Sequence, residues 1–262
     1  MYQREKRVQS KRRKLEPVLD MVIDIRRRMP RLGTRKLYYR LKEKLQTAKI
    51  KLGRDGLFHY LRQHHMLIRP KRSYIKTTYS KHWMKKHPNL YSGMSLVRPE
   101  QAFVSDITYV RSDEGVHYLS LVTDAYSRKI MGYELSHEMK AVDTLKALEQ
   151  AVKGRFYTEE LIHHSDRGLQ YCSGVYQESL KLANIKPSMT DGYDCYQNAL
   201  AERVNGILKQ EFLIHRYASF EDLKRVVRES IDIYNSERPH LSLGMKTPNE
   251  VHRKSQQLTL LA

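Results

Sequence analysis

The spacing of apolar residues predicts three helices near the start of the chain. In residues 15–29 apolar positions recur every three or four residues, and basic residues 26–28 fill the last turn, where cations interact favourably with the helix dipole. Two shorter helices are expected after Pro30, one with Thr34 and the other with Asp55 as its N-cap. Helix, short break and helix in a basic context is the pattern of a helix-turn-helix. It also fits a three-helix bundle whose Lys and Arg side chains are simply solvated.

Residues 68–96 are basic and aromatic but have no steady period. Tyr74, Tyr79 and Trp83 stand among Lys and His residues in this segment, which we interpret as a linker. Such rings could stack on nucleic-acid bases or pin the linker to the next domain. The sequence leaves both alternatives open.

After residue 96 the pattern changes to short β-rich segments and helices. The expected elements are strands at 102–110, 116–125 and 129–135, a helix at 141–152, a strand at 161–164, a helix at 173–183, a strand at 185–189 and a long helix at 197–213. Short connections between the first three strands predict an antiparallel meander. The order is similar to that of the ribonuclease H-like fold, so the predicted class is α/β, with a mixed five-stranded sheet and helices preceded by an all-α region.

The last part of the chain is expected to be helical. Ser219 with Asp222 starts one helix, which Pro239 stops, and residues 247–250 start a short second one. The complete predicted organisation is a basic helix-turn-helix-like region at 1–67, a basic linker at 68–96, an α/β core at 97–216 and a helical extension at 217–262.

Charge separates the chain into two kinds of segment. The protein has 48 Lys and Arg residues against 29 Asp and Glu residues, a formal net charge of +19. Residues 1–90 hold 27 of the basic and 6 of the acidic residues, a net charge of +21, so residues 91–262 are nearly balanced at −2. This segregation predicts a module that grips a polyanion, joined to a nearly neutral globular domain.

Several classes of protein are excluded by the composition. The apolar runs are too short for a membrane span, and the basic N-terminus does not lead into the apolar core of a signal peptide. Two cysteines, Cys172 and Cys195, provide neither a disulfide framework nor a Cys-based zinc site. We therefore expect a cytoplasmic protein with no membrane partner.

Three carboxylates are candidates for a metal site. Asp106 lies in the middle of the first predicted strand, where an unpaired charge is costly, and Asp166 ends the fourth strand, where a ligand crevice opens in α/β sheets. Glu202 belongs to a polar stripe on the long helix. The other members of the stripe are Asn198, Asn205 and Lys209. Three clustered carboxylates repel one another unless cations neutralise them, and oxygen ligands select hard ions. We therefore expect two Mg²⁺ ions, with Mn²⁺ as a substitute.

The motifs around these carboxylates resemble the DDE triad of bacterial insertion-sequence transposases related to retroviral integrases. Asp106 stands in DITY, Asp166 in HSDRG and Glu202 in NALAE, and 35 residues (167–201) separate the last two carboxylates. Lys209 matches the basic residue that the family has seven positions after the glutamate. The carboxylates Asp124, Asp191 and Asp194 fall outside these motifs, and we expect structural or loop roles for them.

The resemblance extends over residues 30–254. The segment Gly33-Thr34-Arg35 and the helices after it resemble the helix-turn-helix ahead of the core in orfB-type products of the insertion-sequence group IS three. Phe103 and Gln197 stand where the family often has Trp and Asp, and neither belongs to the triad.

What the resemblance implies is a ribonuclease H-like integrase core in which Asp106, Asp166 and Glu202 are both the catalytic residues and the metal ligands. Water would hydrolyse the DNA at the element ends, and the exposed 3′ hydroxyl would then attack target DNA. The implied partners are double-stranded DNA of the terminal repeats and of the target, further copies of the chain on that DNA, and the upstream orfA product or a fusion with it, in the bacterial nucleoid.

The candidate DNA contacts lie in both parts of the chain. They are Arg35, Lys36, Arg54 and Arg62 in the N-terminal helices, and His164, Arg167, Asn198 and Lys209 around the triad. His164 and Arg167 could instead orient Asp166, and Arg238 and His240 could contact DNA or stabilise the core. Two other functions remain open at this point, a DNA-binding regulator with an inactive core and a nuclease without joining activity.

Overall fold

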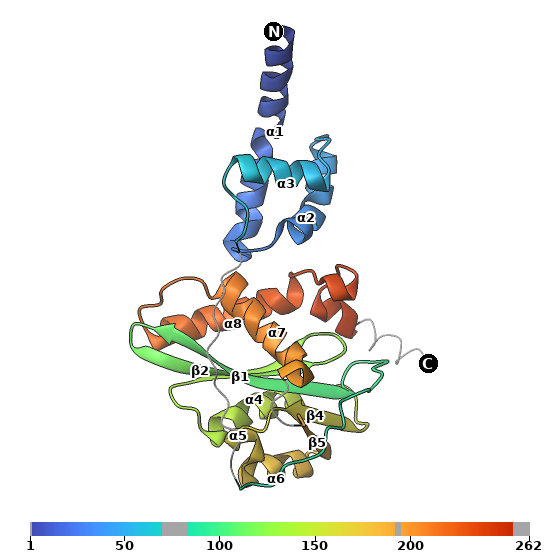
Figure 1. The fold of residues 1–262 in the computed structure, drawn as a ribbon, viewed down its shortest axis with the longest axis vertical. Helices are drawn as coiled ribbons and strands as arrows, with labels where there is room; N and C mark the ends of the chain where they lie inside the picture. The colour runs from blue at the N-terminus through green and yellow to red at the C-terminus, as the bar shows by residue number, and fades with distance from the viewer. Residues whose placement is uncertain (1, 70–82, 192–194, 254–262) are drawn as a thin grey trace. The chain divides into compact units, whose positions relative to one another are not determined.

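The computed structural model describes residues 2–69, 83–191 and 195–253, with side chains described for 15–69, 83–191 and 197–253. Internal contacts divide the chain into two compact units (Figure 1), residues 1–72 with 239–245 and residues 73–238 with 246–262. The finer division predicted at residues 67, 96 and 216 stays a prediction, and Tyr74 and Tyr79 lie outside the described residues. Within the described ranges, no helix is long and apolar enough to cross a membrane.

The N-terminal unit contains three helices, α1 (Tyr2–Arg28), α2 (Thr34–Thr47) and α3 (Arg54–Gln63). Their buried apolar positions follow the predicted helical spacing and include Val18, Val22 and Ile25 of α1, Leu37, Leu41 and Leu45 of α2, and Leu57, Tyr60 and Leu61 of α3. The hydroxyl of Tyr60 also donates a hydrogen bond to the carbonyl oxygen of Leu15 over 2.9 Å. The three stripes form the core of this unit.

The starts of these helices differ from the prediction. The N-caps of α2 and α3 are Gly33 and Gly53, both with extended backbone, so neither Thr34 nor Asp55 is a cap. Asp55 instead lies in the first turn of α3 and accepts a hydrogen bond from Nε of Arg54 at 2.8 Å. The first helix begins at Tyr2 rather than at residue 15, because the Lys, Arg, Gln and Glu residues before it favour helix without an apolar period.

The second unit contains the predicted mixed five-stranded sheet. Its strands are β1 (Ala102–Ser112), β2 (Gly115–Asp124), β3 (Ile130–Ser136), β4 (Leu161–Ser165) and β5 (Ile185–Met189). They lie in the order β3-β2-β1-β4-β5. The first three strands form the antiparallel meander, and β4 pairs in parallel with β1 and β5. The prediction of the sheet is confirmed, with strand ends within two residues of those expected.

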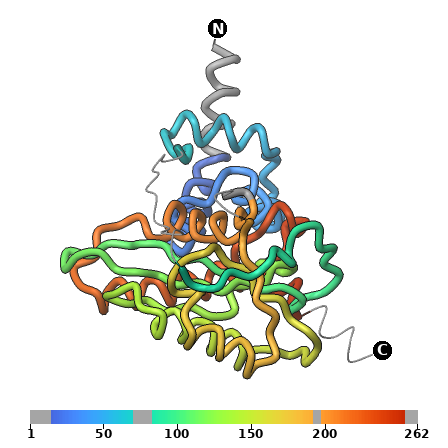
Figure 2. Tube along the Cα trace, turned by 60° about the horizontal axis from the view of Figure 1, so that its bottom comes forward, coloured from blue at the N-terminus to red at the C-terminus, as the bar shows by residue number. Residues whose placement is uncertain are grey.

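Helices cover both faces of the sheet (Figures 1 and 2). α4 (Ala141–Lys153), α5 (Leu169–Cys172) and α6 (Gly174–Leu182) lie on one face, and α7 (Ala199–Ile207) and α8 (Phe220–Ser236) lie on the other. The backbones of α4 and β3 approach very closely at Gly132, where a Cβ atom would stand 2.0 Å from the carbonyl oxygen of Ala147. Glycine at this position therefore sets the distance between helix and sheet.

The long helix predicted at 197–213 is divided into three parts. A 3₁₀ turn (Cys195–Asn198) precedes α7, and a π-helical turn (Leu208–Phe212) follows it, with the N–H of Leu213 donating to the carbonyl oxygen of Leu208. In the π-helical turn, Glu211 makes a two-point ion pair with Arg238, whose side chain is 1% exposed. Arg238 therefore stabilises the core, which was one of the two alternatives open for it.

Both predicted helix starts near the C-terminus are confirmed. The Ser219 hydroxyl accepts a hydrogen bond from the N–H of Asp222 at 3.1 Å. Thr247 and Glu250 cap each other, because the Thr247 hydroxyl accepts from the N–H of Glu250 and the Glu250 carboxylate accepts from the N–H of Thr247.

Candidate active site

The alternation of side chains along β1 directs Asp106 and Ser105 to opposite faces of the sheet. Asp106 points to the α7 face, where its Oδ2 accepts a hydrogen bond from Nδ2 of Asn205 at 2.8 Å. Ser105 points to the α6 face, where its hydroxyl and that of Tyr176 hydrogen-bond to Nε2 of the buried His163 at 2.8 and 2.9 Å. Burial lowers the pKa of His163 to about 3, so this ring is neutral. The strand that carries Asp106 is therefore held on its opposite face by the hydrogen bond between Ser105 and His163.

The polar stripe, which runs along α7 and the turns on either side of it, faces β1, as predicted. Nδ2 of Asn198 donates to the backbone oxygen of Ser105 at 3.1 Å, and Nζ of Lys209 donates to the hydroxyl of Thr108 at 3.2 Å. Together with the hydrogen bond from Asn205 to Asp106, these contacts join the polar stripe to successive residues of β1. They place Glu202, which shares the stripe, on the same side of the sheet as Asp106.

Asp166 follows the last residue of β4 and begins the loop that leads into α5. Its Oδ1 accepts a hydrogen bond from the N–H of Gly168 at 3.0 Å, and a Cβ atom on Gly168 would stand only 3.0 Å from this oxygen. Glycine two residues after the aspartate therefore lets the backbone approach the carboxylate. Because β4 lies beside β1 in the sheet, Asp166 comes to the same region as Asp106.

The three carboxylates act on one another electrostatically. The pKa of Asp106 is raised to about 7, first by desolvation and then by the negative charges of Asp166 and Glu202, against the hydrogen bond from Asn205. Desolvation and the charge of Asp166 also raise the pKa of Glu202. The negative charge is thus disfavoured at both Asp106 and Glu202, whose carboxylate oxygens are candidate metal ligands.

This chemistry fits a hard divalent cation, which would remove the repulsion. Among the described residues, no three His, Cys, Asp or Glu side chains already have the geometry of a metal site.

The other residues predicted around the triad have different environments. His164 is completely buried, and its ring nitrogens hydrogen-bond to the hydroxyl of Ser188 at 2.9 Å and to the backbone oxygen of Gln197 at 3.1 Å. It therefore ties β4 to the segment before α7, which agrees with a positioning role rather than a phosphate contact. Asn198 is also buried, whereas Arg167 is half-buried and Lys209 is exposed.

Asp124 has the structural role expected of it. Its buried carboxylate accepts from the N–H groups of Ser127 and Glu100, each at 2.6 Å, and from the Ser127 hydroxyl. The sequence analysis did not identify Glu100 and His252, which hydrogen-bond to each other at 3.1 Å beside this carboxylate. Asp191 is exposed in the segment before α7, and Asp194 lies outside the described residues.

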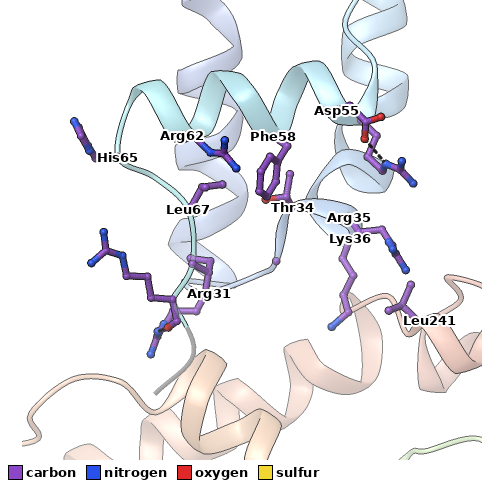
Figure 3. Close-up of a pocket in the computed structure, with 14 residues that line it drawn as sticks. Arg31, Thr34, Arg35, Lys36, Asp55, Phe58, Arg62, His65, Leu67 and Leu241 are labelled. Atoms are coloured by element: carbon purple, nitrogen blue, oxygen red, sulfur yellow. Dashed lines mark hydrogen bonds and ion pairs between the residues drawn. The ribbon is translucent and has the colours of Figure 1, made fainter. Parts of the chain in front are cut away.

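The four predicted DNA contacts of the N-terminal unit, Arg35, Lys36, Arg54 and Arg62, line one pocket between α2 and α3 (Figure 3). We call this pocket the basic groove. The exposed ring of Phe58 lies in it, with the guanidinium of Arg62 4.9 Å from the ring centroid. The groove therefore combines several cations with an exposed aromatic face, which is a combination suited to nucleic acid.

Comparisons with known proteins agree with this geometry. Two family models, both described as Integrase core domain, match residues 97–195 and 183–248. The chain is 36% identical over 229 residues to "Insertion element IS600 uncharacterized 31 kDa protein" of Shigella sonnei, covering 86% of this chain and 83% of that protein. It is 34% identical over 199 residues to "Transposase InsF for insertion sequence IS3A" of Escherichia coli (strain K12), covering 74% of this chain and 69% of that protein.

A further relative and one solved structure extend the comparison. The putative transposase for insertion sequence element IS986/IS6110 of Mycobacterium tuberculosis is 36% identical over 160 residues, and the match spans 58% of each chain. The fold is similar to a chain of the simian T-cell lymphotropic virus intasome, with a TM-score of 0.53 and 17% sequence identity, over 84% of this chain and 70% of that chain. The triad, the sheet order and these matches lead to one conclusion: the chain belongs to the DDE transposases of the IS3 group of bacterial insertion sequences, enzymes with an integrase core domain.

Proposed function

We propose that the chain cleaves DNA at the ends of an insertion sequence in a Mg²⁺-dependent reaction and joins the exposed 3′ ends to target DNA. The observation that carries the proposal is the contact of the α7 polar stripe with β1. This contact, through Asn205 and Asp106, brings Glu202 to the sheet that also positions Asp166. The charges of both other carboxylates then act on Asp106.

Asp106, Asp166 and Glu202 would hold the metal ions. When bound, Mg²⁺ supplies charge neutralisation for the attacking and leaving oxygens of an in-line displacement at phosphorus. In the first step the oxygen of water bonds to phosphorus and the bond to the 3′ oxygen breaks, which leaves a 3′ hydroxyl. In the second step the oxygen of that 3′ hydroxyl bonds to a phosphorus of the target DNA, and the bond from this phosphorus to the target's own 3′ oxygen breaks, which leaves a 3′ hydroxyl on the target strand. The nucleophile is water in the first step and DNA in the second, and no side chain of the protein takes that role.

The remaining residues of the site would bind and orient. Lys209 is exposed, and its ammonium group donates to Thr108, which lies on the same face of β1 as Asp106. The same ammonium group is 5.5 Å from the centroid of the Tyr109 ring. We assign it to a DNA phosphate beside the scissile bond. His164 is assigned to positioning, because both its ring nitrogens are bonded to protein groups. Arg167, next to Asp166, is assigned to the DNA backbone.

We assign retention of DNA to the N-terminal unit through the basic groove. Residues 1–90 carry the net charge of +21 that gives salt-dependent phosphate binding, and the remainder of the chain has no excess of cations. Several copies of the chain are proposed to assemble on paired element ends, with the orfA product or a fusion with it as a further partner.

The test uses the full chain, terminal-repeat DNA labelled at one end, and Mg²⁺. Glu202→Gln and Asp106→Asn should reduce both cleavage and joining by several orders of magnitude. Glu149→Gln, at an exposed position of α4 on the opposite face of the sheet, is the control and should be fully active. Full strand-transfer activity of Glu202→Gln would disprove the triad assignment. Cleavage without labelled ends in target DNA would indicate a nuclease, and DNA binding without turnover by the parent chain would indicate a regulator.

A further inference from the structure

Asn205 is a polar residue in direct contact with a carboxylate of the triad. It lies on α7 one turn after Glu202, its side chain is buried, and its Nδ2 donates to Oδ2 of Asp106 over 2.8 Å. The two residues stand 99 positions apart in sequence, and no feature of the sequence assigns this asparagine a role.

The residues around Asn205 would pack as well against an apolar side chain as against an amide. Its neighbours Val204 and Leu208 are buried apolar residues, and asparagine is a weaker helix former than leucine. The Oδ1 atom of Asn205 is buried and, among the described residues, has no hydrogen-bond partner, which is unfavourable for stability. An apolar side chain would avoid this loss, so the amide has to be explained by its contact with Asp106.

A single hydrogen bond of this kind controls the orientation of a carboxylate. The Cγ–Oδ2 direction of Asp106 is fixed once Oδ2 is held by a donor on a rigid helix, and the position of Oδ1 follows from the planarity of the group. The N–H of Ile107 also donates to this carboxylate, but a donor on the same strand cannot relate Asp106 to α7. The Asn205 amide is the group that fixes the Asp106 carboxylate relative to the helix that carries Glu202.

We infer that Asn205 is a positioning residue of the metal site: its amide holds the Asp106 carboxylate in the orientation in which it shares a cation with Asp166 and Glu202. The inference rests on the proposed function, because it assumes that these three carboxylates bind a divalent ion. Groups that hydrogen-bond to metal ligands typically change metal affinity by about 10- to 100-fold when they are removed.

The experiment compares Asn205→Leu with the parent chain. Leucine is branched at the same atom and removes both amide functions without adding a charge. We expect the variant to bind Mn²⁺ about 10- to 100-fold more weakly, measured by the electron paramagnetic resonance signal of free Mn²⁺. In strand transfer the apparent KM for the metal should rise by a similar factor, whereas kcat at saturating metal should stay close to that of the parent. A merely structural role of Asn205 would not move the metal affinity of the folded protein.

The matched control is Asn235→Leu. Asn235 is also a buried amide on a helix, and it bonds to the backbone N–H and oxygen of Ile130 at 2.9 and 3.0 Å. Its loss should lower the melting temperature and leave the Mn²⁺ affinity unchanged. Asn205→Ala gives the same readout should leucine prevent folding.

Two results would overturn the inference. If Asn205→Leu and Asn205→Ala bind Mn²⁺ within two-fold of the parent while Asp106→Asn abolishes binding, the positioning role is disproved and the triad stands. If Asp106→Asn also binds Mn²⁺ like the parent, the metal site of the proposed function is disproved, and the role of Asn205 with it.

Discussion

Neutralising Asp106 should make the protein more stable, although under the proposed function it should also abolish catalysis. The pKa of Asp106 is raised from 3.8 to about 7, first by desolvation and then by the charges of Asp166 and Glu202. Between these two pH values the folded protein keeps a proton that the unfolded chain releases. The free energy of unfolding therefore falls as the pH rises through this window, because the folded state binds more protons than the unfolded state.

The size of the effect follows from the pKa change. A change from 3.8 to about 7 corresponds to about 4 kcal/mol, since each pKa unit is worth about 1.4 kcal/mol. Asp106→Asn removes this penalty, because the neutral amide has the same shape and its oxygen can still accept from Nδ2 of Asn205. The variant should be more stable than the parent by about 4 kcal/mol at pH 8 and by close to nothing at pH 4.

The assay is urea unfolding followed by circular dichroism, in EDTA, at pH 4, 6 and 8. The stability difference between Asp106→Asn and the parent should grow steadily with pH across this range. Addition of Mg²⁺ at pH 8 should stabilise the parent and leave the variant unchanged, because a ligand that binds only the folded state raises its stability. Equal stability of Asp106→Asn and the parent at pH 8 would refute the conclusion that desolvation and charge repulsion at Asp106 destabilise the folded protein. The same gain in stability at pH 4 as at pH 8 would also refute it.

Three further predictions follow from single contacts. Lys209→Ala should weaken binding of element ends, whereas Lys209→Arg should largely preserve it, in a filter-binding assay with terminal-repeat DNA. Gly132→Ala should lower stability by at least about 1–3 kcal/mol in a urea titration, because the added Cβ atom would overlap the carbonyl oxygen of Ala147. Gly206→Ala, which has open space around it on α7, should raise stability by about 0.5–1 kcal/mol in the same titration. Arg62→Ala in the basic groove should reduce the slope of log K against log salt by about 1, and Arg27→Ala, which is exposed on α1 outside the groove, should not reduce it to that extent.

Local patterns were sufficient to predict the strands of the sheet and the approximate positions of most helices. The bounds of β5 agree with the prediction, and the meander of β1, β2 and β3 follows from short turns between β-rich segments. The N-caps of α2 and α3 were predicted wrongly as Thr34 and Asp55, whereas Gly33 and Gly53 are the caps. The prediction followed residue type, because Thr and Asp are better N-caps than Gly. Capping preference alone does not determine which residue adopts the extended backbone.

The candidate site was predictable in its membership but not in its contacts. The spacing of Glu202, Asn205 and Lys209 places them on one stripe of a helix, and period two places Asp106 and Thr108 on one face of a strand. Which member of the stripe meets which residue of the strand depends on how α7 lies along β1, and local periodicity carries no information about that register. For the same reason the pair of Glu100 and His252, 152 residues apart, left no signal in the sequence.

The contrast between two buried carboxylates, Glu100 and Asp106, supports the proposal of a cation site at the triad. At Glu100 burial disfavours the negative charge, but hydrogen bonds from His252 and from the N–H groups of Tyr157 and Phe156 outweigh it, and its pKa is lowered. At Asp106 burial acts in the same direction, but the neighbours include two further carboxylates and the pKa is raised. A carboxylate that protein donors already neutralise gains little from a metal ion. A carboxylate surrounded by like charges gains most, so the repulsion that weakens the metal-free protein is the same free energy that favours binding of the cation.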